Sequence, residues 1–228
     1  MLDFDATDNP LHGQQEAPFF HSYYDCYCYL PLYVFCGQQL LCAYLRPSRI
    51  DGARHAAANL KLLVTRLRQV WPAVRNVFRG DSGFCRQRII NYCKRAHVHY
   101  IVGLARQGNN PRYVVTNLAG KAQELYDAVY CQRGEAENRI RQAQVGLFAT
   151  RTSCHVFQSN QLRMLLAALG YVLIERLRAL ALAGTALATA QVDTLRIKLL
   201  KVAAVVTRTT QRIPRRIRLY LGLQLAQC

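Results

Sequence analysis

The amino-acid sequence predicts an α/β fold in which a mixed sheet is flanked by helices and followed by a helical C-terminal part. Three consecutive strand-like segments open the chain, helical and strand-like segments then alternate, and the pattern from residue 120 onward is mostly helical. Consecutive strands are typical of an antiparallel meander, whereas strands separated by a helix are typical of parallel crossovers. With 51% apolar residues, the 228-residue chain can bury a core.

The first strands are predicted from short apolar runs bounded by turn residues. Met1–Asp5 is apolar at alternate positions and ends at acidic residues. Leu11–Phe20 holds Gly and Pro residues and is expected to be a loop. Tyr27–Phe35 is almost wholly apolar, which is typical of a strand buried on both faces. Gln38–Leu45 is the next predicted strand, and Pro47 stops it.

Helices and strands alternate in the next part of the chain. Ala53–Val70 has apolar residues at helical spacing and is predicted to be a helix. Val74–Phe78 is expected to be a short strand, Cys85–Ala96 a helix and His99–Leu104 a strand. Arg112–Asn117 is a further strand-like run.

Two long apolar helices are predicted over Leu162–Ala183 and Val192–Val206. The first is apolar enough to be compared with a membrane span. It contains four charged residues that are costly at membrane depth, namely Arg163, Glu175, Arg176 and Arg178. A buried or half-buried helix is therefore expected, and no membrane is expected as a partner. A basic run broken at Pro214 follows, with Arg208, Arg212, Arg215, Arg216 and Arg218.

The charge of the chain points to a polyanionic partner. The formal net charge is +17, which favours nucleic acid first and an acidic membrane surface second. Arg far outnumbers Lys, and the Arg fork matches phosphate oxygens in a bidentate manner. The codon bias of a GC-rich genome is an alternative explanation of the Arg excess.

The cysteines indicate no metal site of their own. Nine Cys residues are present without a Cys-x-x-Cys pair, so structural zinc is not expected. Most of them lie in apolar runs and are interpreted as small core residues. Asp3, Asp5 and Asp8 stand where a signal peptide has basic residues, so none is predicted. A reducing cytoplasm is the expected location.

Two acidic motifs at predicted strand ends carry most of the functional information. Asp5 ends the first strand, and Asp81 follows the strand Val74–Phe78. In mixed and parallel sheets, ligand sites collect at the carboxyl ends of strands. Carboxylates gathered there in a basic protein are typical of Mg²⁺ held against a phosphodiester.

Glu137 is the candidate for a third acid. On a continuous helix, Tyr130, Arg133 and Glu137 fall within about 60° of one another, and Arg141 and Gln144 lie on the same stripe. Such a polar stripe suits metal and phosphate binding. If Gly134 ends a helix, Tyr130 leaves the stripe. The alternative interpretation is a solvated helix face with casual ion pairs.

Four segments of the chain resemble bacterial insertion-sequence transposases of the DDE type, in their group-one branch. They are LDFDATD from Leu2, HGQQ from His12, RGDSGF from Arg79 and YCQRGEAENRI from Tyr130. Asn160-Gln-Leu-Arg and Leu195-Arg-Ile-Lys-Leu-Leu-Lys also resemble the C-terminal helices of that family. The resemblance runs over nearly the whole chain.

The resemblance implies an RNase H-like fold and a triad of acids that binds two Mg²⁺ (or Mn²⁺) ions. Such enzymes cut transposon ends by attack of water and then attack target DNA with the freed 3′-hydroxyl. By motif, Asp81 is the second acid and Glu137 the third. The first is Asp5 or Asp3, and Asp5 is preferred because a small residue and then Thr7 follow it.

The resemblance also implies residues that contact DNA. Tyr130 and Arg133 match the Tyr and Arg that accompany the Glu, and Arg133 and Arg141 would neutralise charge in the transition state. Gln144 stands where a further basic residue is expected, with Arg141 as its substitute. His12 lies near the acids, although such a residue is more often a hydrogen-bonded loop group. The aromatic cluster Phe19 to Tyr33 could stack bases but is more often core.

Compared with the family pattern, the chain is expected to be a truncated single domain. Residues 1–106 would form the first part with five strands, 107–119 the remnant of a deleted β-rich insertion, and 120–228 the helical part with the third acid. The expected function is that of a transposase catalytic core that cleaves and transfers DNA strands. The alternative is an inactive fragment that binds DNA or a full-length transposase. A homodimer is a further expected form.

Overall fold

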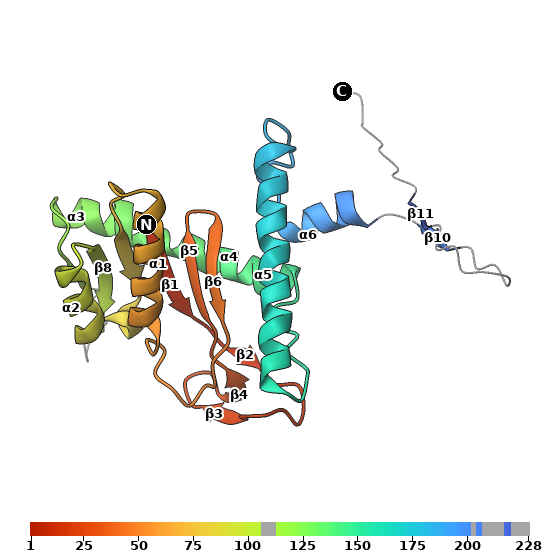
Figure 1. Cartoon of the computed structure of the whole chain (residues 1–228), viewed down its shortest axis with the longest axis horizontal. Coiled ribbons are helices and arrows are strands. Elements are labelled where there is room, and N and C mark those ends of the chain that lie inside the picture. Colours follow the sequence, from red (N-terminus) through yellow and green to blue (C-terminus); the bar gives the residue numbers. More distant parts are fainter. Residues whose placement is uncertain (106–112, 202–203, 207–216, 220–228) are drawn as a thin grey trace.

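The computed structural model describes residues 1–105, 113–201, 204–206 and 217–219, the last two segments as backbone only. Its centre is a six-stranded sheet in the order β6-β5-β1-β7-β8-β9 (Figure 1). Strands β1, β7 and β8 are parallel, and β5, β6 and β9 run antiparallel to their neighbours. The predicted mixed sheet is thereby confirmed.

The strands and helices of this sheet lie close to their predicted positions. The strands are β1 Leu2–Ala6, β5 Leu32–Cys36, β6 Gln39–Tyr44, β7 Val77–Gly80, β8 His99–Leu104 and β9 Tyr113–Thr116. Helix α1 spans Ala56–Val70 and α2 spans Gln87–Arg95. A 3-10 turn, η1 Ser82–Phe84, follows β7.

Each face of the sheet carries its own core. Leu2 and Phe4 of β1 and Leu32 and Val34 of β5 pack with α1 and α2. The intervening residues of β5 point to the opposite face and pack with the helices that follow residue 133. Strand β5 is therefore buried on both faces, which explains its continuous apolar sequence.

The prediction of one strand over Tyr27–Phe35 is wrong. Strand β4 (Cys26–Tyr29) joins a separate three-stranded sheet with β2 (Asn9–Pro10) and β3 (Phe19–His21), and only β5 belongs to the main sheet. Pro31 separates the two strands, because its nitrogen has no proton to donate to a ladder. Leu30 exchanges two hydrogen bonds of 2.8 Å with Arg46, through the Arg46 carbonyl and Nε, and so fixes this corner.

The helical C-terminal part contains turns of three kinds. Helix α3 is Ala122–Glu124, and α4 is Gly134–Arg141. Turns η2 (Leu125–Tyr130) and η4 (Gln142–Gly146) are π-helical, and η3 (Cys131–Arg133) is 3-10. Helix α5 (Phe157–Leu180) begins five residues before its predicted start and packs on β6, as Figure 1 shows.

The prediction of a second long helix over Val192–Val206 is wrong at its C-terminal end. Helix α6 spans only Val192–Leu195, and a π-helical turn η5 continues to Leu200. Residues Ala204–Val206 form β10, which pairs with β11 (Ile217–Leu219). The β-branched Val205 and Val206 favour a strand. The basic residues Arg208, Arg212, Arg215 and Arg216 lie outside the described residues.

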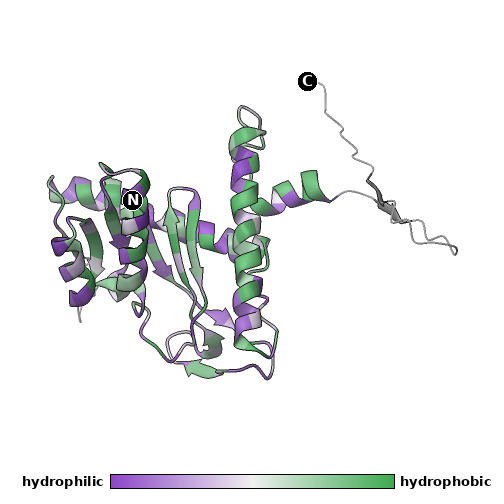
Figure 2. Cartoon of the chain, viewed as in Figure 1, coloured by the Kyte–Doolittle hydropathy of each residue, from purple (hydrophilic) through white to green (hydrophobic). Residues whose placement is uncertain are grey.

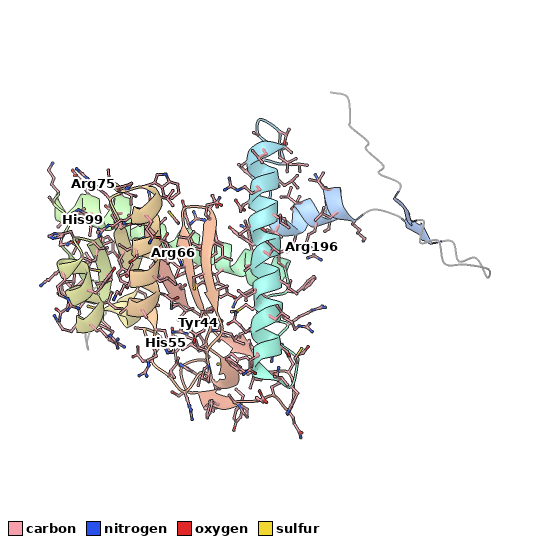
Figure 3. All side chains as sticks on the ribbon, in the orientation of Figure 1. Tyr44, His55, Arg66, Arg75, His99 and Arg196 are labelled. Atoms are coloured by element: carbon pink, nitrogen blue, oxygen red, sulfur yellow. The ribbon has the colours of Figure 1, made fainter. Side chains whose placement is uncertain are left out.

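Arg196 fixes η5 against the rest of the helical part. Its side chain, labelled in Figure 3, donates a 2.6 Å hydrogen bond to the Gly146 carbonyl, and its guanidinium lies 4.4 Å from the centre of the Phe148 ring. Of the helices in the described residues, none is long and apolar enough to cross a membrane.

Candidate active site

Adjacent parallel strands bring two of the predicted acids together. Strand β1 pairs with β7 in a register that sets Asp3 beside Arg79 and Phe4 beside Gly80. The next residues along this register are Asp5 and Asp81, at the carboxyl ends of the two strands. Because side chains alternate along a strand, Leu2 and Phe4 face the core formed with α1 and α2, while Asp3 and Asp5 share the opposite face of the sheet.

Asp5 and Asp81 line one pocket of about 490 Å³. It is lined by Asp5, Ala6, Thr7, Tyr23, Tyr24, Asp81, Arg133, Glu137, Ile140, Arg141 and Gln144. The structure thus gathers seven predicted site residues from three separate parts of the sequence. Three others, Asp3, His12 and Tyr130, do not line it.

Arg133 lies among the carboxylates. Its Nη1 is 3.7 Å from Asp5 Oδ1, and its Nη2 donates a 2.5 Å hydrogen bond to Glu137 Oε1. Although burial lowers the pKa of this guanidinium, the charges of Asp5, Glu137 and Asp81 raise it above its usual value. Arg133 therefore stays charged and offsets part of the negative charge of the pocket.

The Asp5 carboxyl resists ionisation. Burial raises its pKa to about 7, and the neighbouring charges of Asp81 and Glu137 add to this effect. Arg133 and the Ala6 N–H act in the opposite direction, the latter through a 3.0 Å hydrogen bond to Asp5 Oδ1. Carboxylates that lie close together and are partly buried are typical of a functional site that binds a cation.

One oxygen of the Asp81 carboxylate receives no hydrogen bond from the residues that the structure describes. Its Oδ1 is buried and forms no hydrogen bond within the described part of the chain. Gly83 lies directly beneath it, and a Cβ atom at that position would be 3.0 Å from Oδ1. Oxygen ligands of carboxylates are those preferred by Mg²⁺, so Asp5 and Asp81 fit a divalent cation.

Within the described residues, the Glu137 side chain does not join Asp5 and Asp81 in a preformed metal site. Its side chain is 52% exposed and paired with Arg133. Across the described ranges, no group of three or more His, Cys, Asp and Glu side chains is close enough to hold a metal ion as it stands. Glu137 must therefore leave Arg133 and turn toward the two Asp residues to act with them.

Asp3 has a different environment from Asp5. Arg79 donates hydrogen bonds to both of its carboxylate oxygens, at 2.5 and 2.9 Å, and both side chains are buried. The same guanidinium donates to the backbone carbonyls of Val129 and Gln132. The Asp3–Arg79 pair therefore ties the two central strands to the helical segment that carries Glu137.

Tyr130 lies behind the pocket. Its hydroxyl packs against Gly103 of β8, where a Cβ atom would collide with it. Burial raises the pKa of Tyr130, and the charge of Asp81 adds to this effect although Arg133 opposes it. Gly134 does not end the helical path, because its φ of −54° and ψ of −26° are helical. Arg133, Glu137, Arg141 and Gln144 thus keep the predicted common face, with Tyr130 beyond the pocket.

We expect Gly103→Ala to lower the free energy of unfolding by about 1–3 kcal/mol, because the added methyl group displaces the Tyr130 hydroxyl. Gly134→Ala is the matched control, since open space surrounds that glycine and the backbone is helical. The control variant should gain about 0.5–1 kcal/mol. Urea unfolding of both variants measures the difference, and equal values would contradict the Gly103–Tyr130 contact.

His12 is not part of the pocket. Its backbone N–H donates a 3.0 Å hydrogen bond to Gln15 Oε1, and its side chain is exposed. Gln144 lines the pocket and donates a 3.1 Å hydrogen bond to the Asp8 carbonyl, while Thr7 Oγ1 lies 3.5 Å from Asp8 Oδ1. Of these predicted residues, Thr7 and Gln144 thus line the pocket, whereas His12 does not.

Tyr23 and Tyr24 were predicted only as part of the aromatic cluster Phe19 to Tyr33, not as residues of the site. Both lie in the turn between β3 and β4, and the Tyr24 hydroxyl donates a 3.3 Å hydrogen bond to the Ala6 carbonyl. Tyr23 is 82% exposed, and its ring meets that of Tyr24 edge-on. Asp25 adopts a left-handed φ of 53°, which is typical of a tight turn. Asp is a common turn residue, so Asp25 was the sequence signal that could have placed Tyr23 and Tyr24 in a turn.

The interpretation of the aromatic cluster Phe19 to Tyr33 as core is correct for only part of it. Tyr29 and Tyr33 are fully buried, whereas Phe20, Tyr23 and Tyr27 are more than half exposed. The exposed rings lie on the small sheet and its turn, and of these three Tyr23 lines the pocket.

A family model described as transposase DDE domain group 1 matches residues 1–109 and 105–222. The chain belongs to this family. Neither a curated protein nor a solved structure matches it. The mixed sheet flanked by helices agrees with the α/β RNase H-like fold implied by the resemblance. Membership in this transposase family indicates a role in DNA transposition, with DNA as the partner and a divalent metal ion as the expected cofactor.

Proposed function

We propose that this transposase-family chain is a catalytic core that cleaves DNA strands at insertion-sequence ends and transfers them to target DNA. One observation carries the proposal: two carboxylates from adjacent parallel strands share a pocket with Glu137, and one of their oxygens is buried without a hydrogen-bond donor from any described residue. The raised pKa of Asp5 supports the same conclusion, because a divalent cation would relieve the repulsion that causes it.

Asp5, Asp81 and Glu137 are the proposed metal ligands, for two Mg²⁺ or Mn²⁺ ions. Asp5 is preferred to Asp3 as the first acid because Asp5 lines the pocket, while both Asp3 oxygens are bound by Arg79. When bound, such ions activate the attacking water or 3′-hydroxyl and stabilise the leaving oxygen.

The cationic side chains of the pocket are proposed to bind the scissile phosphate. Arg133 already lies between the acids, and Arg141 is exposed at the pocket wall without an ion pair to another described residue. Both can donate to non-bridging phosphate oxygens and so stabilise the charge that develops in the transition state. Tyr130 lies near Arg133, although it does not line the pocket, and completes the proposed DNA-binding set.

Asp3 and Arg79 hold this arrangement in place. Because Arg79 binds the Val129 and Gln132 carbonyls, it fixes the turns η2 and η3, which carry Arg133 and lead into the helix α4 with Glu137. We assign to this pair a positioning role, since neither side chain reaches the pocket.

We also propose that the chain is organised as a single domain. The family model matches in two parts that meet at residues 105–109, in the region where the sequence predicts a deleted insertion. Within 107–119, the described strand β9 forms the edge of the main sheet. This supports a short connection from the first part to the helical part that carries Glu137, with residues 107–112 outside the described ranges.

The decisive experiment is nicking of supercoiled plasmid in the presence of Mg²⁺ or Mn²⁺. We expect the wild type to nick and Asp81→Asn to lose at least about 100-fold of the rate, because the buried ligand oxygen is replaced by an amide group. Asp25→Asn is the control, since this exposed acid adopts a left-handed conformation that Asn also tolerates. Equal nicking by wild type and Asp81→Asn would refute the proposed site.

A second candidate function is binding without cutting, to DNA or to a full-length transposase. The observation in its favour is that Glu137 pairs with Arg133 instead of joining the two Asp residues. A folded wild type that binds DNA but gives no metal-dependent nicking would identify this function.

Tyr23 is expected to stack on an unpaired base near the scissile phosphate. We expect Tyr23→Ala to weaken binding of single-stranded DNA by about 1–3 kcal/mol, and Tyr23→Phe to retain binding, because stacking requires the ring. Tyr113→Ala is the control, an exposed tyrosine on β9 away from the pocket. Fluorescence anisotropy with a labelled oligonucleotide measures the change, and equal affinities for Tyr23→Ala and wild type would exclude stacking.

A further inference from the structure

Helix α5 is apolar on two opposite faces. One face is buried, through Met164, Tyr171 and Ile174, and packs in the core with β5 and β6. On the other face lie Leu162, Leu166, Leu169, Leu173 and Leu180, which are 55–81% exposed. At 100° per residue these five leucines fall within an arc of about 60°, directly opposite Tyr171. Figure 2 shows the hydrophobic residues that run along much of this helix.

A continuous apolar stripe along a helix is normally covered by another element. The five leucines, here called the leucine seam, together expose on the order of 500 Å² of apolar surface, which is the size of an interaction site. A standard interface buries about 800 Å² on each partner. The 47%-exposed Leu165 beside the seam adds to this surface. The seam therefore supplies more than half of the area that one partner of a standard interface buries.

The order of residues along the seam is symmetric. Leu169 and Leu173 lie two residues to either side of Tyr171, and Leu162 and Leu180 lie nine residues to either side. An antiparallel second copy of α5, crossing at Tyr171, would place Leu169 on the partner's Leu173 and Leu162 on the partner's Leu180. The spacing of four and three residues is that of helices which interlock their side chains.

Arg176 lies on the same face of α5 as the leucine seam and decides between the two orientations. Arg176 follows Leu173 by three residues and is exposed. In a parallel pair it would face the same arginine of the other copy, which repels it. In an antiparallel pair it faces the partner's Leu166, on which the methylene groups of an arginine can lie while the guanidinium reaches water.

We propose that two copies of this chain associate through the leucine seam of α5, antiparallel, about a two-fold axis at Tyr171. The interface is isologous, so each contact occurs twice. Because the seam is separate from the pocket residues, this association does not depend on the proposed catalytic function.

The test is the molar mass of the whole chain by analytical ultracentrifugation at micromolar concentrations without DNA. The wild type should be a dimer, and Leu169→Glu and Leu173→Lys should each weaken the dimer by about 100-fold or more, because each puts two charges into the interface. Leu62→Glu is the control, since Leu62 is 56% exposed on α1 and outside the seam. Circular dichroism should show the same fold for all variants.

Mixing the two seam variants tests the orientation. Only an antiparallel pair sets the introduced acid opposite the introduced base, so Leu169→Glu and Leu173→Lys should form a mixed dimer when combined. A monomeric wild type, a dimer that survives both substitutions, or a failure of the mixture to associate would each overturn the proposal. Plasmid nicking plays no part in these readouts, so their outcome is distinct from that of the proposed activity.

Discussion

Asp5→Asn is expected to stabilise the protein at pH 8 by up to about 4 kcal/mol when no divalent cation is present. The pKa of Asp5 is raised from 3.8 to about 7, chiefly by burial. The unfolded chain therefore loses this proton first, and the stability of the wild type should fall as the pH rises from about 4 to about 7. The amide of Asn carries no charge at any of these values, so the variant lacks this loss.

Thermal unfolding of both proteins between pH 4 and pH 8 measures the effect, and the two curves should converge at the acidic end. Mg²⁺ or Mn²⁺ should raise the unfolding temperature of the wild type more than that of the variant. Asp51→Asn is a control with the opposite sign. Burial alone would raise the pKa of Asp51, but hydrogen bonds from Arg86 and the Ala53 N–H lower it overall. Parallel curves for wild type and Asp5→Asn would contradict the buried state of this carboxyl.

Arg79→Met is expected to destabilise the protein by about 3–5 kcal/mol, because it leaves the Asp3 carboxylate buried without a counter-charge. Both side chains of this pair are at most 5% exposed. The double variant Asp3→Leu with Arg79→Met should recover most of the lost stability, since two apolar groups of similar size need no partner. Urea unfolding measures both values.

Activity should separate the two functions of Arg79. The double variant keeps an apolar interior but loses the donors to the Val129 and Gln132 carbonyls, so its nicking rate should stay low even where its stability is restored. Lys121→Met is the control, because Lys121 forms an exposed pair with Glu124 and its loss should not alter stability measurably. A double variant with wild-type nicking would show that the turn needs no such anchor.

The sequence sufficed to place the acids on the fold but not to describe their surroundings. Asp5 and Asp81 follow apolar runs, and the rule that sites collect at the carboxyl ends of strands brings them together. Helical spacing likewise placed Glu137, Arg133 and Arg141 on one face. These predictions rest on local periodicity, which the chain expresses strongly.

The features that the sequence did not reveal depend on contacts between distant segments. Pro31 breaks an apolar run that otherwise has the pattern of one strand, and the break sends Tyr23 and Tyr24 to the pocket on a separate sheet. In the sequence, Arg79 is not distinguished from the other arginines of this basic protein. The structure shows that it binds Asp3 and the Val129 carbonyl of the helical segment. The periodicity of apolar residues in a sequence does not indicate which backbone carbonyl, 50 residues away, an arginine contacts.

The π-helical turn η2 has a consequence for changes in chain length. A π turn closes its hydrogen-bonded ring with one residue more than an α turn. Loss of one residue from Leu125–Tyr130 would let that turn close as an α-helix, and the residues after it would keep their direction. Loss of one residue inside α4 would instead rotate everything beyond it by about 100°. The helical path to Glu137 thus contains one residue more than an α-helical path needs. The Glu137 carboxylate can therefore keep its position after a single deletion within Leu125–Tyr130.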